Sequence, residues 1–304
     1  MSLIATLTGR WRGPTALAPD ALPAGTLLGS VRIERRVARG NTATVYAATD
    51  ARGALVAVKA LHHGGGDVDS EDAARQAFLQ AGERASRLEH PHIARVFGGG
   101  FTRGITFITM EWLAGVDLSR WARPGRQLPD AAVLAIGADL AEALDHAHRQ
   151  GIVHRDVKPA NAMYDPAMQR VVLTDFGLAR TPDAQASRSG AMLGSPVYMA
   201  PELLAGRAAD ARSDFYALGV LLFELLAGRP PFEAPTLGAL LQAVATAAAP
   251  RLQDLRAGAP GTDALDELLA PLLAKDPDER PADARAWASQ ARLQRLWLTA
   301  PPAP

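Results

Sequence analysis

The pattern of hydrophobic positions divides the chain into two parts that meet near residues 110–115. The first part contains short β-rich runs bounded by turn residues, which is typical of strands. Strands are predicted at residues 31–33, 44–46, 55–61, 93–97 and 105–110, and a helix at about residues 70–88. The turn residues Asp50 to Gly53 indicate an antiparallel hairpin between the second and third of these strands.

The second part has its hydrophobic residues at helical spacing. After Pro129 and Asp130, which supply an N-cap, they recur every three or four positions at Val133, Ile136, Leu140, Leu144 and Ala147. Gly151 ends that helix, a second one is predicted over residues 213–227, and helical patterns continue from residues 237 and 263. The pattern therefore predicts a small β-rich part with one helix and a larger, mainly helical part.

The two ends of the chain lack such periodicity. Residues 1–27 are expected to form a flexible or loosely packed leader, and residues 296–304 a Pro-rich tail. No stretch resembles a signal peptide. The most hydrophobic run, residues 217–227, contains Glu224 and is shorter than the roughly 20 residues that span a bilayer. We therefore expect no membrane segment in this chain and a cytoplasmic location.

Composition excludes several classes of function. The chain has 32 Lys+Arg and 32 Asp+Glu, so it offers no electrostatic basis for binding nucleic acid. It has no cysteine, which excludes a disulfide scaffold, a thiolate metal site and a cysteine nucleophile. Lysine occurs only at Lys59, Lys158 and Lys275. Arginine does not replace lysine where a compact point charge is needed, so these positions are candidates for such chemistry.

Four short motifs follow one another, each on the expected type of element. Val-Ala-Val-Lys at residues 56–59 lies on a predicted strand, and His-Arg-Asp-Val-Lys-Pro-Ala-Asn occupies residues 154–161. Asp-Phe-Gly follows at residues 175–177 and Ala-Pro-Glu at residues 200–202. Together these motifs resemble the eukaryotic-type Ser/Thr protein kinase family over about residues 28–295. His-Pro-His-Ile-Ala-Arg, from residue 90, is similar to the bacterial members.

The resemblance implies a fold and an activity. The fold would be α+β and two-lobed, with a small antiparallel β N-lobe containing one helix (about residues 28–112) and a larger, mainly helical C-lobe (about residues 113–295). The activity would be transfer of the ATP γ-phosphoryl group to Ser/Thr hydroxyls of protein substrates, with Mg²⁺ or Mn²⁺. Lys158, two residues after Asp156, is typical of Ser/Thr kinases. The oligomeric state stays open.

The resemblance also implies roles for individual residues. Asp156 would orient the substrate hydroxyl or accept its proton, and Lys158 would place a cation against the γ-phosphate. Asn161 and Asp175 would supply oxygen ligands to Mg²⁺, and Lys59 would hold the α- and β-phosphates. The ATP pocket would be lined by Val37, Ala38, Arg39, Gly40, Val45, Ala57, Lys59, Met110, Glu111, Leu113 and Met163.

Other residues match substrate-side and structural positions of the family. Ser195 stands in the substrate loop. Candidate phosphorylation sites of the activation loop are Thr181, Ser187 and Ser189, and Arg155 could bind a phosphate attached to one of them. Glu202 and Arg280 are expected to form an internal ion pair, and Asp214 to anchor the backbone of the catalytic loop. The remaining lysine, Lys275, is expected at the surface or at a helix end.

Two departures from the family pattern leave alternatives open. Gly40 is the only one of three glycines that remains in the phosphate-covering loop, where Ala38 and Ala43 replace the other two. The helix glutamate that pairs with the strand lysine falls at Ala81. Glu83 is the nearest acid, but two residues rotate it by about 200° around the helix. A register slip could bring Glu83 inward to Lys59, or Glu83 could be a solvated helix residue.

These departures motivate a second interpretation from another class. The chain could be a nucleotide-binding pseudokinase that acts as an interaction or scaffold module. Against this, Lys59, Asp156, Asn161 and Asp175 are all present. A kinase-like enzyme acting on a small molecule is disfavoured by Ala-Pro-Glu at residues 200–202 and by the long activation loop.

Overall fold

The computed structural model describes residues 18–40, 42–62, 68–176, 196–256, 259 and 261–299. The chain divides into two compact units, one of residues 1–79 and 98–112 and one of residues 80–97 and 113–304. A single boundary near residue 112 was expected. Residues 80–97 join the second unit because Ala85, Leu88 and Ile93 pack into its hydrophobic core.

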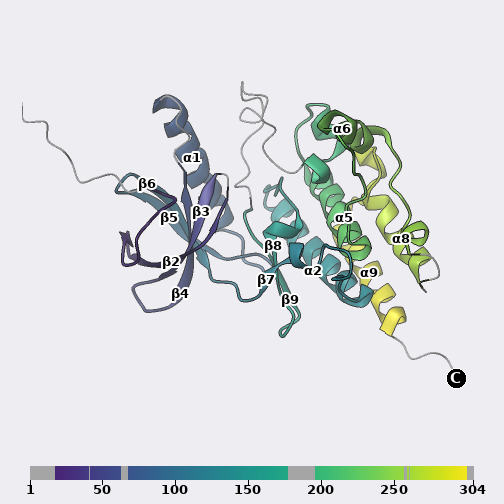
Figure 1. The fold of residues 1–304 in the computed structure, drawn as a ribbon, viewed down its shortest axis with the longest axis horizontal. Coiled ribbons are helices and arrows are strands. Elements are labelled where there is room, and N and C mark those ends of the chain that lie inside the picture. The colour runs from purple at the N-terminus through teal and green to yellow at the C-terminus, as the bar shows by residue number, and fades with distance from the viewer. Residues whose placement is uncertain are drawn as a thin grey trace, which may run out of the picture. The chain divides into compact units, whose positions relative to one another are not determined.

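The first unit contains a six-stranded sheet in the order β1-β2-β3-β4-β6-β5 (Figure 1). Its strands are β1 (Leu27–Leu28), β2 (Val31–Arg39), β3 (Ala43–Thr49), β4 (Leu55–Leu61), β5 (Val96–Thr102) and β6 (Ile105–Glu111). The neighbouring pairs from β1 to β4, and β4 with β6, are antiparallel. Ile33, Tyr46, Val58 and Ile105 are fully buried against this sheet and form the centre of its core.

Strand β5 differs from the prediction, because it continues past residue 97 through three glycines, Gly98, Gly99 and Gly100. A Cβ atom at Gly99 would lie 2.6 Å from the carbonyl oxygen of Phe107. The absence of side chains thus allows β5 to approach β6 closely. Ile93, the expected start of this strand, instead forms an isolated bridge with Leu173.

The described part of the N-terminal leader packs on the sheet. The buried Tyr46 hydroxyl donates to the carbonyl oxygen of Pro19 at 2.9 Å and accepts from the backbone N–H of Leu22 at 3.1 Å. Leu22 is itself buried in the core of this unit. Residues 18–27 therefore differ from the loosely packed leader that was expected, whereas residues 1–17 lie outside the described part of the chain.

The second unit is mainly helical. Its helices are α2 (Asp130–Arg149), α4 (Pro201–Leu204), α5 (Ala211–Ala227), α6 (Leu237–Thr246), α7 (Leu252–Leu255), α8 (Thr262–Leu272) and α9 (Ala284–Thr299). Short 3-10 turns occur at η1 (Leu118–Arg120), η2 (Pro159–Asn161), η3 (Pro196–Tyr198) and η4 (Pro277–Glu279). A small antiparallel sheet joins β7 (Val116–Asp117), β8 (Ala162–Asp165) and β9 (Arg170–Leu173).

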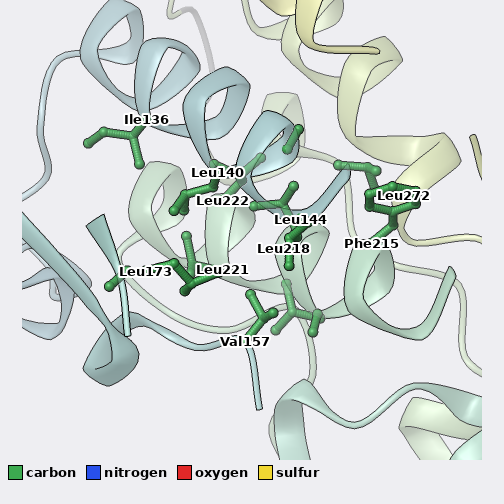
Figure 2. Close-up of a cluster of buried hydrophobic side chains, with 14 of the residues drawn as sticks. Ile136, Leu140, Leu144, Val157, Leu173, Phe215, Leu218, Leu221, Leu222 and Leu272 are labelled. Carbon is green, nitrogen blue, oxygen red and sulfur yellow. The ribbon is translucent and has the colours of Figure 1, made fainter. Parts of the chain in front are cut away.

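The core of the second unit is built around α2 and α5. Figure 2 shows side chains of α2, among them Leu140 and Leu144, packed with Leu218, Leu221 and Leu222 of α5. The hydrophobic positions that predicted α2 are all buried. Both helices also end as predicted, near glycines in the left-handed conformation (Gly151, φ 72°; Gly228, φ 74°).

The helix α9 continues through Thr299, so residues 296–299 of the expected tail are helical. Helix α1 (Val68–Ala85) crosses the division between the two units. Among the described helices, none combines the length and the hydrophobicity needed to cross a membrane.

Candidate active site

Three of the predicted catalytic residues lie together in the second unit. The Lys158 ammonium lies 2.9 Å from Oδ1 and 2.7 Å from Oδ2 of Asp156. The Asn161 amide nitrogen donates to the same carboxylate, at 2.8 Å, and to the backbone carbonyl of Asp156, also at 2.8 Å. The loop before β8 thus brings a carboxylate, a cation and an amide to one point.

The 3-10 turn η2 explains how this cluster forms. Pro159 begins the turn and has no N–H to satisfy, and the extended Lys158 precedes it. The turn brings Asn161 back to Asp156, five positions earlier in the chain. Both Nδ2 bonds of Asn161 are made to Asp156, and its Oδ1 accepts no hydrogen bond from a described residue.

The second expected metal ligand follows the neighbouring strand. The backbone carbonyl of Asn161 accepts from the N–H of Thr174 at 2.8 Å and from its hydroxyl at 3.0 Å. Asp175 comes next and has a positive φ of 66°. This conformation is costly for a residue with a side chain, and such strain concentrates at functional sites. Asn161 and Asp175 therefore flank the same end of the β8–β9 pair.

The buried carboxylate of Asp214, on α5, holds the catalytic loop from behind. It accepts from the backbone N–H of His154 at 2.7 Å and of Arg155 at 2.8 Å. Arg155 has a positive φ of 69°, and these two bonds stabilise the unusual backbone there. The anchoring role predicted for Asp214 is what this geometry provides.

Two histidines that sequence reasoning did not single out complete this support. His148, at the end of α2, donates from Nε2 to Asp214 at 2.8 Å. His154 accepts the N–H of Asp156 at Nδ1 (3.2 Å), so its Nε2 carries the proton and donates to Thr174 (2.8 Å). His154 also meets the ring of Phe176 edge-on at 4.6 Å. His154 thereby links the Asp156 loop to the Asp175 segment. The sequence signal for this role was the position of His154 at the start of the motif at residues 154–161.

The first unit carries a separate group of predicted site residues on one face of its sheet. Val45 is the register partner of both Ala38 and Lys59, and Ala57 is the partner of Met110. Because side chains alternate between faces along a strand, Val45, Ala57, Lys59 and Met110 share a face. Ala57 and Lys59 lie two positions apart on β4. This face of the sheet therefore places apolar side chains next to the ammonium of Lys59.

The hairpin between β2 and β3 closes at the one glycine that remains in the loop. The N–H of Gly40 donates to the carbonyl oxygen of Ala43 at 2.9 Å, and a Cβ atom at Gly40 would lie 3.3 Å from this oxygen. The loop thus keeps a glycine where the backbone is tight. Nearby, Val37 is exposed, and Arg39 forms an ion pair with Asp20 at 2.9 Å.

The C-terminal part of α1 shows which face each candidate partner of Lys59 occupies. Ala81 is buried, whereas Glu83 forms an i,i+4 ion pair with Arg87 at 3.1 Å with both side chains mostly exposed. Of the two alternatives for Glu83, the register slip that would turn it inward is not observed, and its mostly exposed side chain is that of a solvated helix residue. The pairing of Glu83 with Lys59 receives no support from this geometry and stays a prediction.

The remaining predicted residues are distributed as follows. Glu111 ends β6, Leu113 follows the last residue of the first unit, and Met163 lies on β8 opposite Asp117. Thr181, Ser187, Ser189 and Ser195 lie outside the described residues.

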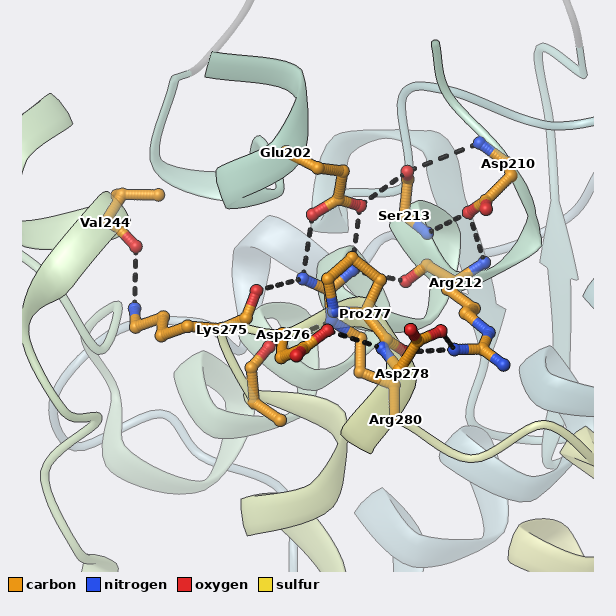
Figure 3. A network of polar contacts seen from close by, with 11 residues as sticks. Glu202, Asp210, Arg212, Ser213, Val244, Lys275, Asp276, Pro277, Asp278 and Arg280 are labelled. Atoms are coloured by element: carbon orange, nitrogen blue, oxygen red, sulfur yellow. Dashed lines mark hydrogen bonds and ion pairs between the residues drawn. The ribbon is translucent and has the colours of Figure 1, made fainter. Parts of the chain in front are cut away.

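The predicted ion pair on the substrate side is present and buried (Figure 3). Arg280 donates to both carboxylate oxygens of Glu202 at 2.8 Å, and the Ser213 hydroxyl donates to Oε1 at 2.7 Å. Burial raises the pKa of Glu202, but the hydrogen bonds from Arg280 and Ser213 outweigh it and hold that pKa below its ordinary value. Nearby, the Tyr198 hydroxyl donates to Glu224 at 2.5 Å.

Of the two interpretations of Lys275, the surface position was wrong, whereas its ammonium does lie at the end of a helix, α6. Its ammonium is half-buried, donates to the carbonyl of Val244 at 2.7 Å, and lies 3.9 Å from the centroid of the Phe232 ring. Nothing in the local sequence indicates this, because the contacts come from residues 31 and more positions away.

The fold and the two groups of site residues are typical of one class of protein, the two-unit α+β proteins of the kinase type. The protein kinase domain family matches residues 31–297, and the chain belongs to this family. The antiparallel sheet of the first unit and the helices of the second confirm the predicted fold class.

Known proteins similar to this chain agree with that assignment. It is 35% identical over 294 residues to the serine/threonine-protein kinase PknJ of Mycobacterium tuberculosis, covering 93% of this chain and 49% of the relative. It is 32% identical to the serine/threonine-protein kinase pkn3 of Myxococcus xanthus, over 89% of this chain and 50% of the relative. The chain thus spans about half the length of these curated relatives.

A solved structure is similar over nearly the whole chain. The kinase domain of Mycobacterium tuberculosis PknI matches with a TM-score of 0.70 and 32% sequence identity, covering 90% of this chain and 100% of that one. The structure of Rad53 residues 1–466 in complex with AMP-PNP matches with a TM-score of 0.68 and 25% identity, covering 84% of this chain and 64% of that one. The predicted relation to bacterial eukaryotic-type Ser/Thr kinases is confirmed, and that family generally uses ATP and a divalent metal ion.

Proposed function

We propose that this chain transfers the γ-phosphoryl group of Mg²⁺-bound ATP to serine and threonine hydroxyls of proteins. The observation that carries the proposal is the Asp156 cluster, in which Lys158 and Asn161 hold the carboxylate in one orientation. A fixed carboxylate is what the reaction needs, because phosphoryl transfer depends mostly on positioning and on charge stabilisation.

Each residue of the cluster has a distinct task in this proposal. Asp156 accepts a hydrogen bond from the acceptor hydroxyl and takes up its proton as the new O–P bond forms. Lys158 places its ammonium beside the transferred group, where negative charge shifts from the γ-phosphoryl oxygens to the leaving oxygen. Lys59, on the sheet of the first unit, binds the α- and β-phosphates.

The oxygen donors fit a divalent metal ion. The carboxylate of Asp175 and the free Oδ1 of Asn161 are the hard ligands that Mg²⁺ prefers, and Mn²⁺ accepts the same set. The metal ion supplies charge neutralisation to the phosphates when it is bound. The positive φ at Asp175 supports this role, because strained backbone is concentrated at functional sites.

The proposal is tested with the purified chain, γ-labelled ATP, Mg²⁺ and casein as a generic acceptor. We expect label on serine and threonine of casein, and loss of transfer when a chelator removes the metal ion. Phosphoamino acid analysis distinguishes this from tyrosine transfer. An absence of transfer while labelled ATP still binds would instead support a nucleotide-binding scaffold.

We further propose that the chain phosphorylates its own activation loop at Thr181, Ser187 or Ser189. Arg155 supports this, because its side chain is exposed and makes no ion pair with any described residue. A phosphate adds about 1.5 to 2 negative charges and forms charge-assisted hydrogen bonds with arginine. Mass spectrometry after incubation with Mg²⁺ and ATP should locate phosphate at one or more of these positions. An unmodified loop in a preparation that labels casein would contradict the proposal.

A further inference from the structure

Lys275 caps the C-terminal end of α6 from a distant part of the chain. Its Nζ donates to the carbonyl of Val244, which lies in the last turn of α6. The last four carbonyls of a helix have no partner within the helix, and a cation at this end also interacts favourably with the helix dipole. The sequence of α6 contains no charged residue, so this cation comes from outside the helix.

Two aromatic rings hold the same ammonium in place. It lies 3.9 Å from the centroid of Phe232 and 5.7 Å from that of Tyr216, within the range of cation–π attraction. Burial, and secondly the charge of Arg280, lower the pKa of Lys275 to about 8. Burying this charge is costly, so we infer that the contacts of the ammonium with Val244 and with the two rings fix the position of α6.

The segment that carries Lys275 also anchors α4. Arg280, five residues later, donates to both oxygens of Glu202 on α4 and to the carbonyl of Lys275 itself at 3.2 Å. Figure 3 shows both connections, with Lys275 reaching Val244 and Arg280 reaching Glu202. Helix α6 packs against α4 and η3. Residues 275–280 therefore connect to the two helices that border η3.

We propose that Lys275 is a positioning residue for the protein acceptor, because its ammonium holds α6 against α4 and η3. This inference rests on the proposed kinase function, in which η3 continues the substrate loop from Ser195. Lys275 contacts no reacting group in this proposal. It acts through α6, so its loss should weaken acceptor binding and leave the chemical step and ATP binding unchanged.

The charges around Lys275 give the proposal a pH signature. Arg280 faces it from its own segment and Tyr216 from α5, Glu202 of α4 lies beyond Arg280, and α6 has no titratable side chain. Above about pH 8 the amine loses its proton, which relieves the cost of burying its charge, while Nζ can still donate to Val244. The packed position of α6 is then favoured, so the KM for acceptor should fall through this range.

Global stability should increase with pH over the same range. The pKa of Lys275 is lowered on folding from 10.5 to about 8, so between these values the unfolded chain binds more protons than the folded one. The free energy of unfolding contributed by this group then increases with pH. The fall in acceptor KM and the gain in stability above pH 8 thus have the same cause, the relief of the buried charge.

The test compares Lys275→Met and Lys275→Arg with the unmodified chain. We expect Lys275→Met to raise the KM for casein about tenfold, because the variant loses one hydrogen bond from a charged group. Its kcat, its KM for ATP and its thermal stability should not change, because methionine fills the same space without a buried charge. Lys275→Arg should restore part of the affinity, and in both variants the KM should no longer fall above pH 8.

Hydrogen exchange supplies a readout that does not need activity. Amides in the last turn of α6 and in η3 should exchange faster in Lys275→Met, and not in the control Glu279→Gln, whose exposed side chain has no charged partner among the described residues. Unchanged exchange, or an unchanged casein KM in a chain that transfers phosphate, would overturn the proposal. Absence of transfer in the unmodified chain would count against the kinase function, while the exchange experiment would still decide the role of Lys275.

Discussion

Asp156→Asn is expected to lower the rate of phosphoryl transfer by about 10²- to 10⁴-fold, the usual contribution of a positioned acid–base group. Asparagine fills nearly the same space, but its amide cannot take up the proton of the acceptor hydroxyl. The loop should keep its conformation, because Asp214 holds the backbone of His154 and Arg155 independently of the Asp156 carboxylate. The loss should therefore appear in kcat, with little change in ATP binding.

The measurement combines steady-state transfer to casein with direct titration of ATP binding. Asp254→Asn is the matched control, since Asp254 is an exposed residue of α7 whose side chain has no partner among the described residues. It should transfer phosphate at the unmodified rate. A rate for Asp156→Asn within a few-fold of the control would show that another group performs this step.

The sequence carried most of the site of the second unit, for a physical reason. Asp156, Lys158 and Asn161 lie within six residues, so one loop conformation is enough to bring them together. The helix α2 was equally predictable, because each of its periodic positions contacts the core. Sequence patterns therefore predicted those parts of the structure that are formed by residues close together in the chain.

The sequence did not predict the positions of residues that are held by contacts with distant parts of the chain. Lys275 looked like a surface residue because its partners on α6 and α5 lie far away in the chain. Residues 18–27 show no hydrophobic period, yet they pack because the Tyr46 hydroxyl satisfies two of their backbone groups. The glycines of β5 indicated a break, whereas the strand continues and the close approach of β6 requires a glycine at Gly99.

The buried pair of Arg280 and Glu202 carries the largest expected effect on stability. Arg280→Met should lower the free energy of unfolding by about 3–5 kcal/mol, because it leaves a buried carboxylate without its counter-charge. The carbonyls of Ala274, Arg212 and Lys275 would also lose the guanidinium as a donor. A solvent-exposed ion pair, by contrast, contributes about 0–1 kcal/mol.

Chemical denaturation of Arg280→Met, Glu202→Gln and the double variant separates these contributions. Glu202→Gln removes the charge but keeps an acceptor for Ser213, so it should cost less than Arg280→Met. The double variant should be more stable than the sum of the single losses implies, because the uncompensated carboxylate is then absent. Additive losses would show that the two charges do not depend on each other.

The pair should also make stability depend on acid. The folded pKa of Glu202 lies below the ordinary value of 4.5, so its contribution is fully present above pH 4.5 and is lost as pH falls through the folded pKa. The difference in free energy of unfolding between the unmodified chain and Glu202→Gln should therefore be constant near neutral pH and shrink in acid. If the difference in free energy of unfolding between the two chains stays constant down to the acid transition, protonation of Glu202 is not the cause of the acid dependence. Because Arg280 also donates to the carbonyl of Lys275, this experiment measures the stability of the same segment that we propose to position α6.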